Sequence, residues 1–294
     1  MPDWAQETRQ KWVEMEQRWK HEREVAREHA PKMSPGQMVA KSQALASLSQ
    51  VDYDGSRLCG VNKEHEVFCS NDEKSWTSFG KGLPGKEFTQ VTVGDDALYA
   101  IDEKHQVHKR SMKKDSKWAN LGGGGEGESM LHIDADGPRL CGVTVDNKIK
   151  CWERERVGPK EWKEGWVEKQ GIPQVEKNGH PIIQKPSSVS ITSDDMYITT
   201  TDDYIFKRVG GIAPPEATWM QIPGKLHSIS AYSDRLCGAN TKGAVYCTYN
   251  DGKKWQPTDG ELHHREHRAM TQVTTYGDKL YGVDQWDYVI KQDL

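Results

Sequence analysis

The sequence predicts an all-β protein, a six-bladed β-propeller with four-stranded blades, preceded by an N-terminal α-helical extension. Three observations carry this prediction. A cysteine pair recurs three times, a tyrosine/lysine pair with the same spacing recurs between the cysteine pairs, and a strand around a tryptophan follows five of the six pairs. A repeat of about 40 residues is the length of one four-stranded propeller blade.

The composition is that of a polar globular chain. Of the 294 residues, 35% are hydrophobic and 29% are charged, and the net charge is −4. Because no long run of one charge sign occurs, we expect no nucleic-acid partner. No apolar run approaches the roughly 20 residues that a membrane helix needs, so we expect no membrane insertion. The 11 Trp and 10 Tyr residues can fill a thin or divided core.

All six cysteines belong to pairs whose members lie ten positions apart around a turn-like centre. In a hairpin with its turn midway, such residues face each other across two strands with Cα atoms roughly 4.5–5.5 Å apart, within reach of a disulfide. We therefore predict three cross-strand disulfides, in preference to a zinc site, whose ligand spacing is different. The pairs are Cys59/Cys69, Cys141/Cys151 and Cys237/Cys247.

Disulfides favour a secreted or extracellular protein, although paired free thiols in a cytoplasmic protein remain the alternative. The first residues, "MPDWAQETRQKW", are charged and show no apolar signal segment.

Three further hairpins have the same frame with tyrosine and lysine in place of the cysteines. A lysine stem and ammonium group opposite a tyrosine ring can pack and make a cation–π contact, so the pair can replace the disulfide. Cysteine-type and tyrosine-type hairpins alternate along the chain. The second set of pairs is Tyr99/Lys109, Tyr197/Lys207 and Tyr281/Lys291.

Each repeat begins with an alternating apolar/polar strand, continues with the hairpin and ends with the tryptophan strand. The sixth repeat stops at "YVIKQDL" before a tryptophan strand. A closed ring would take the missing strand from 37–48, which would remove a free sheet edge. The predicted domains are therefore a helical extension at 1–36 and a propeller at 37–294.

The residues at 219–247, a tryptophan followed by "IPGKL", "SIS", "CGAN" and "AVYC", resemble the tectonin repeat of tachylectin/tectonin-type lectins from fungi, slime moulds and fish eggs. Further matches are "LPGKEFTQVTVG" at 83–94 and "LYGVDQWDYVIK" at 280–291. The resemblance covers about 48–294 and implies a six-bladed propeller that recognises carbohydrate. The cysteine units, the insertion in the third repeat and the N-terminal extension depart from simpler members.

Four residues are our candidates for carbohydrate binding. Arg57, Arg139 and Arg235 each precede the first cysteine of a pair by two positions, so they would line three equivalent inter-blade surfaces. An arginine can hydrogen-bond sugar hydroxyls or hold a carboxylate. The alternative is that each arginine stem packs on the neighbouring blade and bridges to an acidic turn. Trp286 lies at the centre of a hairpin turn, where an exposed ring could stack on a sugar.

Other motifs give little support for catalysis or cofactors. "HHREH" at 263–267 formally matches an inverted zinc-protease motif, but a third ligand is hard to place among the last residues, so we expect a solvated loop and no metal. "DYDG" and "DADG" lack the later ligands of a calcium loop and are better read as tight turns. The glycine run at 122–125 lacks the rest of a phosphate loop, so we expect no cofactor.

The first residues predict a helix from about residue 4 to 29, ended by Pro31. An apolar stripe along it predicts packing on the propeller, with self-association or docking of a partner as the alternative. The stripe consists of Ala5, Thr8, Trp12, Met15 and Trp19.

The resulting expectation is a non-catalytic, multivalent glycan-binding protein with repeated shallow sites, whose avidity can exceed single-site affinity by roughly 10² to 10⁴. The alternatives are a secreted protein-interaction scaffold that uses the helix and one propeller face and, less favoured, an enzyme with a site in the central channel.

Overall fold

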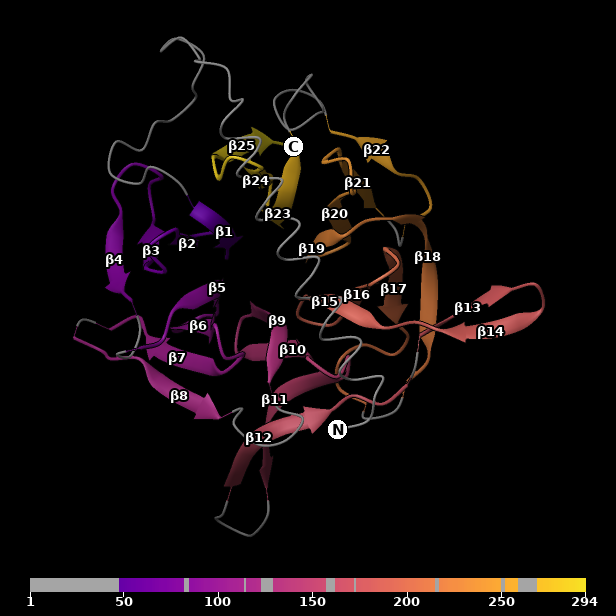
Figure 1. Cartoon of the computed structure of the whole chain (residues 1–294), viewed down its shortest axis with the longest axis horizontal. Helices are drawn as coiled ribbons and strands as arrows, with labels where there is room; N and C mark the ends of the chain where they lie inside the picture. The colour runs from indigo at the N-terminus through magenta and orange to yellow at the C-terminus, as the bar shows by residue number, and fades with distance from the viewer. Residues whose placement is uncertain are drawn as a thin grey trace.

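The computed structural model describes residues 48–81, 85–113, 115–122, 129–156, 162–171, 173–214, 217–249, 252–258 and 269–294. It confirms the six-bladed propeller: Figure 1 shows six antiparallel sheets arranged around a central axis. The predicted N-terminal helix and the predicted closing strand before residue 48 lie outside the described residues.

The first three blades are four-stranded meanders in which each strand pairs with the next along the chain. Blade 1 contains β1 (Leu48–Tyr53), β2 (Leu58–Asn62), β3 (Val67–Ser70) and β4 (Thr77–Gly80). Blade 2 contains β5 (Phe88–Val93), β6 (Ala97–Asp102), β7 (Val107–Ser111) and β8 (Ala119–Gly122). Blade 3 contains β9 (Met130–Asp136), β10 (Arg139–Thr144), β11 (Ile149–Arg156) and β12 (Trp162–Glu168).

The other three blades follow the same plan. Blade 4 contains β15 (Pro186–Ile191), β16 (Met196–Thr200), β17 (Tyr204–Arg208) and β18 (Trp219–Lys225). Blade 5 contains β19 (Ser228–Tyr232), β20 (Arg235–Ala239), β21 (Val245–Tyr249) and β22 (Gln256–Pro257). Blade 6 has three strands among the described residues, which are β23 (Met270–Tyr276), β24 (Lys279–Asp284) and β25 (Val289–Asp293).

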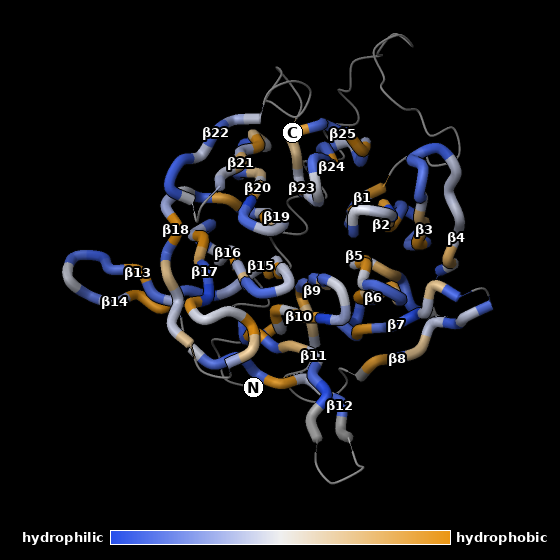
Figure 2. Tube along the Cα trace, turned by 180° about the vertical axis from the view of Figure 1, so that it is seen from behind, coloured by the Kyte–Doolittle hydropathy of each residue, from blue (hydrophilic) through white to orange (hydrophobic). Residues whose placement is uncertain are grey.

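The insertion of the third repeat forms structure of its own. Its residues make a two-stranded hairpin of β13 (Gln174–Lys177) and β14 (His180–Ile183), which projects from the ring beside β18, the outer strand of blade 4 (Figure 2). Within the described residues, no helix is long and apolar enough to cross a membrane.

The predicted disulfides all form, and each joins directly opposed residues of the two middle strands of a blade. Cys59–Cys69 is in blade 1, Cys141–Cys151 in blade 3 and Cys237–Cys247 in blade 5, with Cα–Cα distances of 4.0, 4.0 and 4.1 Å.

The tyrosine/lysine pairs occupy the same register in blades 2, 4 and 6. Lys109 Nζ lies 5.5 Å from the ring centre of Tyr99, and Lys207 Nζ lies 5.4 Å from that of Tyr197. These two contacts confirm the predicted cation–π pairing.

The core is divided, as the composition predicted. Six separate hydrophobic clusters occur, one between each pair of adjacent blades. Between blades 1 and 2, for example, Cys59 and Val61 pack against Phe88, Val91 and Trp118. Because each core is shared by two blades, no blade can bury its apolar surface without its neighbours.

Side chains of the innermost strands join neighbouring blades around the axis. On each innermost strand, one polar side chain accepts a hydrogen bond from a backbone N–H of the following blade, at N···O distances from 2.7 to 3.2 Å. The six accepting residues are Asp52, Thr92, Asp134, Ser190, Ser230 and Thr274. This ring of hydrogen bonds includes the step from blade 6 to blade 1, so it closes the propeller.

A second set of bonds lies two residues earlier on the same strands. Gln50 accepts the N–H of Val91 at 2.8 Å and donates to its carbonyl at 2.9 Å, and Gln90 and Gln272 make the same double contact with the next blade. At the matching position of blade 3, His132 Nδ1 accepts one longer bond of 3.4 Å from Val189 N–H. The blade 3–4 junction is therefore held less tightly at this level than the blade 1–2 junction.

The last blade is fastened to the first on the outside as well. Glu73, in the turn between β3 and β4, accepts hydrogen bonds from the Tyr281 hydroxyl at 2.7 Å and from Lys291 Nζ at 2.9 Å. The tyrosine/lysine pair of blade 6 thus reaches across to blade 1, which replaces the cation–π contact found in blades 2 and 4.

Candidate functional site

The three candidate arginines lie at or beside the start of the second strand of blades 1, 3 and 5, on the propeller face that carries the β1–β2, β9–β10 and β19–β20 turns. Each follows one of these turns and is the first residue of an "RLCG" sequence that occurs at 57–60, 139–142 and 235–238. Their surroundings differ, and the differences decide which of them can reach a ligand.

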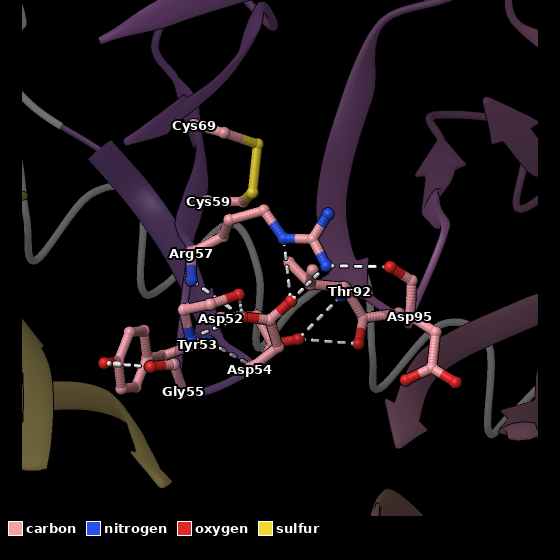
Figure 3. A network of polar contacts seen from close by, with 11 residues as sticks. Asp52, Tyr53, Asp54, Gly55, Arg57, Cys59, Cys69, Thr92 and Asp95 are labelled. Atoms are coloured by element: carbon pink, nitrogen blue, oxygen red, sulfur yellow. Dashed lines mark hydrogen bonds and ion pairs between the residues drawn. A yellow bond between two sulfur atoms is a disulfide. The ribbon is translucent and has the colours of Figure 1, made fainter. Parts of the chain in front are cut away.

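The guanidinium of Arg57 is already bound by other groups of the protein (Figure 3). Its Nη2 lies 2.7 Å from Asp54 Oδ2, its Nε donates to the same oxygen at 2.9 Å, and Nη2 donates to the carbonyl of Asp95 in blade 2 at 2.8 Å. The alternative role weighed from the sequence, a bridge between an acidic turn and the neighbouring blade, describes this arginine.

Arg235 is buried, with 8% of its surface exposed, and its guanidinium carbon lies 5.9 Å from the ring centre of Tyr249 on the adjacent strand. Tyr249 is exposed and covers the arginine from the outside. A ligand would have to displace this ring to reach the guanidinium.

Arg139 lines a hollow of about 500 Å³ between blades 3 and 4. The remaining wall comes from blade 4: the β15–β16 turn supplies Asp194 and Asp195, and β17 supplies Lys207 and Arg208. Within the described part of the chain, Arg139 Nη1 is fully buried and has no hydrogen-bond partner. Arg235 Nε is likewise buried without a partner, so what distinguishes Arg139 from the other two arginines is its position in an open hollow.

The local sequence explains why Arg139 is not held as Arg57 is. In blade 1, Asp54 Oδ1 accepts the N–H groups of Ser56 and Arg57 at 2.8 and 2.7 Å, and this turn points the carboxylate at the guanidinium. In blade 3 the position of Ser56 is taken by Pro138, which has no N–H to donate. Among the described residues, Asp136 makes no ion pair with Arg139, although it occupies the position of Asp54.

Of the charged side chains in the pocket wall, Lys207 forms an ion pair with an aspartate, and Arg208 is bound to a backbone carbonyl. Lys207 Nζ lies 2.9 Å from Asp195 Oδ2. Arg208 is fully buried, and its Nη1 donates to the carbonyl of Gly211 at 2.6 Å. Burial, followed by the charge of Asp95, raises the pKa of nearby Asp136, while the charge of Arg139 acts in the opposite direction.

Apolar groups complete the pocket. Val209, Ile212 and Met220 line it, and Val209 and Met220 are 49% and 42% exposed. The loop from β17 to β18 reaches this position because Gly211 has a φ of +77° and approaches the β15–β16 turn so closely that a Cβ would lie 2.4 Å from the carbonyl oxygen of Asp194.

Sequence reasoning missed Arg208, Val209 and Met220. The "RVGGIAPP" segment that carries the loop was the available signal, because two adjacent glycines mark a chain that must turn tightly.

Trp286 lies on the opposite face, in the turn between β24 and β25. Trp286 is partly buried, which is less exposure than we expected. Its backbone N–H donates to Asp284 Oδ1 at 2.9 Å. The exposed aromatic ring of this turn is Tyr288. The structure therefore does not bring Trp286 together with the three arginines.

Two other interpretations made from the sequence can be compared with the structure. "DYDG" and "DADG" are turns, with Gly55 at φ +91° and Gly137 at φ +58°. The "HHREH" segment at 263–267 lies outside the described residues.

Tryptophans of the outer strands join neighbouring segments of the ring. The Trp118 indole N–H donates to the carbonyl of Phe79 in the preceding blade at 2.9 Å, and Trp219 donates to the carbonyl of Gly171 at 3.2 Å.

Six meandering sheets around an axis, with contacts shared between successive blades, define a six-bladed β-propeller of the repeat-protein class. The family model of the tectonin domain matches residues 47–285, and the chain belongs to this family. No curated protein matches the sequence.

Solved structures show the same fold at low sequence identity. The chain is similar to human WBSCR16, with 8% identity, a TM-score of 0.53 and coverage of 84% of this chain and 76% of the other. It is also similar to virginiamycin B lyase from Staphylococcus aureus, with 12% identity, a TM-score of 0.52 and 84% coverage of both chains. For YCF48 from Cyanidioschyzon merolae the identity is 14%, the TM-score is 0.50 and coverage is 84% and 95%.

Proposed function

We propose that this protein is a non-catalytic glycan-binding protein, a lectin, that recognises surface glycans at the inter-blade surfaces of its propeller. The observation that carries the proposal is the hollow between blades 3 and 4, where Arg139 lies beside acidic and apolar side chains. A sugar presents hydroxyl groups and C–H surfaces together, so a concave site with both kinds of partner suits it. Membership of the tectonin family supports the same interpretation, because the sequence resembles lectins of this type.

The repeated frame suits multivalent binding. Arg57 and Arg235 stand at the corresponding positions of blades 1 and 5, so these surfaces are candidates for weaker sites beside the blade 3–4 pocket. Linked weak sites on one rigid ring would engage a dense glycan surface with avidity. We also propose that the protein is secreted, which is compatible with its three disulfides.

A glycan array probed with the non-reduced protein tests the proposal. We expect selective binding to one group of glycans and a signal at least tenfold lower for Arg139→Ala. Arg154→Ala is the matched control, since it removes an exposed arginine on β11 of the same blade that does not line the hollow. A blank array with folded protein would refute the lectin proposal.

One observation favours a second function, a protein-interaction scaffold. The β13–β14 hairpin projects from the ring and exposes Ile182 and Ile183, which are 40% and 61% accessible. Exposed apolar side chains on a projecting element are typical of protein-binding surfaces. A blank glycan array, combined with capture of one protein that Ile183→Ser no longer binds, would support this function instead.

A further inference from the structure

We propose that the ligand of the blade 3–4 pocket is a sugar that carries a carboxylate, and that Arg139 binds this group. The inference rests on the proposed lectin function and specifies the ligand class of the same site. It concerns one pocket of the ring, and it makes the three "RLCG" arginines unequal in function.

The first support is the unsatisfied bonding capacity of Arg139. Its Nη1 is fully buried and has no partner among the described residues, although a buried guanidinium nitrogen ordinarily has one. A guanidinium is planar and presents its N–H groups in a fork that matches the two oxygens of a carboxylate. Arg139 itself is partly exposed and lines the hollow, so a shift of its guanidinium into the hollow would let a carboxylate satisfy the donor that the protein leaves unused.

The second support is the comparison with Arg57. There Asp54 Oδ2 contacts the guanidinium, while Asp54 Oδ1 accepts backbone N–H groups and so orients the turn. In blade 3, Pro138 removes the N–H that orients the equivalent aspartate, so the position of the internal carboxylate is left for one from outside. The same chemistry that the protein uses internally at Arg57 becomes available to a ligand at Arg139.

The third support is the composition of the pocket wall, which has three cationic and two acidic side chains. Lys207 and Asp195 pair with each other. Arg208, held by the Gly211 carbonyl, adds a positive charge at a fixed position. Asp136 and Glu153 also act electrostatically on Arg139 and Arg208, so the preference for an anion over a neutral sugar rests on the two guanidinium groups at the hollow and not on its net charge.

The apolar wall accounts for the sugar part of the ligand. Val209 and Met220 are partly exposed beside the charged groups, so they can contact ring C–H groups or an acyl methyl group. Two sources offer a carboxylate on a sugar: hexuronic acids, and N-acylated sugar acids such as N-acetylneuraminate. The shared carboxylate is the proposal, and the experiment separates the two sources.

Isothermal titration calorimetry of the intact, non-reduced protein with four sugars provides the test. Methyl glucuronoside and methyl glucoside differ only in the carboxylate, and methyl N-acetylneuraminoside and methyl N-acetylglucosaminide test the acyl group. We expect the acidic sugars to bind at least tenfold more tightly than the neutral ones. Arg139→Ala should abolish this preference, while Arg154→Ala, which removes an exposed arginine of the same blade that does not line the hollow, should retain it.

Failure of this inference can be told apart from failure of the lectin function. Neutral sugars that bind as tightly as acidic ones, with loss in Arg139→Ala, would overturn the carboxylate proposal and leave the lectin function standing. Acidic sugars that bind equally well to Arg139→Ala would overturn the placement at this pocket. No heat with any of the four sugars, together with a blank glycan array, would overturn both.

A second variant tests the physical reason. Pro138→Ser restores the N–H found in blade 1, so Asp136 should turn toward Arg139 and compete with the ligand. We expect at least a fivefold loss of affinity for the acidic sugars with an unchanged melting temperature. Unchanged affinity in a folded Pro138→Ser protein would contradict the role assigned to Pro138.

Discussion

The interface between blades 1 and 2 and the interface between blades 3 and 4 have the same plan and different degrees of closure. Both join a cysteine-type blade to a tyrosine-type blade, and both contain a disulfide in the shared core. At the first interface Gln50 makes two bonds and Arg57 is held by Asp54. At the second, His132 makes one long bond and Arg139 lines an open hollow.

The difference teaches that the repeat specifies the framework, whereas single substitutions within it decide where a ligand can enter. Pro138 in place of a serine and His132 in place of a glutamine leave the strands in register. They reduce the number of internal partners at one junction. Four predictions test this comparison, in order of decreasing effect.

Removing either disulfide should cost the same at both interfaces. We expect Cys59→Ser/Cys69→Ser and Cys141→Ser/Cys151→Ser each to lower the free energy of unfolding by about 3 kcal/mol, because both disulfides close loops of equal length. Denaturant unfolding of the two double mutants measures this. Losses that differ by more than about 1 kcal/mol would show that the looser interface changes how much its disulfide contributes to the free energy of unfolding.

Gln50→Ala should destabilise the tighter interface by about 2 kcal/mol, since it removes two hydrogen bonds and leaves the N–H and carbonyl of Val91 without this partner. Gln50→Glu is the control, because its carboxylate keeps the acceptor and removes the donor. At low pH the protonated carboxyl group can donate again, so we expect a smaller loss of stability there. The melting temperature reports both. An unchanged stability of Gln50→Ala would mean that these bonds do not hold the blades together.

His132→Gln should stabilise the looser interface by about 1 kcal/mol at pH 7, because glutamine makes two bonds to the next blade at three matching positions. The gain should grow as the pH falls. Burial lowers the pKa of His132 to about 4, so the unfolded chain binds a proton that the folded chain excludes, and the wild-type protein loses stability as the pH falls from about 6.5 to 4.

Melting temperatures of both proteins at pH 7.5 and pH 5 measure this pH effect. A difference between wild type and His132→Gln that stays constant with pH would contradict the lowered pKa of His132 in the folded protein.

Asp134→Asn should have the smallest effect, a gain of about 1 kcal/mol or less at pH 7. Burial, together with the charge of Asp52, raises the pKa of Asp134. Because the folded state holds this proton more tightly than the unfolded state, stability is lost as the pH rises from the unfolded value of about 4 through the raised pKa.

Asparagine removes that loss and can still accept the N–H of Ile191 through its amide oxygen. We therefore expect the gain at pH 7 to disappear at pH 3, where wild-type Asp134 is protonated in both states. Thermal unfolding at the two pH values measures it, and a gain that persists at pH 3 would have another cause.

Much of the fold could be predicted from the sequence because its signals are local and repeated. The ten-residue spacing of the pairs gives the hairpin register, and the alternating segments give the innermost strands. The hairpin β13–β14 was not predicted, because its strands have no counterpart in the other repeats and most of their residues are exposed. The alternation of apolar and polar residues that marks a strand with one buried face is therefore absent from this hairpin.

The candidate site was predicted only in part. Position along the strand placed Arg139 at an inter-blade surface, and the same logic applied equally to Arg57 and Arg235. What separates them is their surroundings: Asp54 beside Arg57, Tyr249 over Arg235, and the β17–β18 loop around Arg139. The surroundings of each arginine depend on how the neighbouring blade and its loop pack against it. The spacing of the repeats does not specify this packing.

The alternation of two blade types has a consequence for how such a ring can evolve. Every disulfide faces a tyrosine-type blade, and every tyrosine of a pair faces a cysteine-type blade. Insertion or loss of one blade would place two blades of one type side by side, so that a disulfide would face a cysteine-type blade or a paired tyrosine would face a tyrosine-type blade. Gene duplication and deletion would preserve every junction only by acting on a two-blade module, so the ring should change size in even steps.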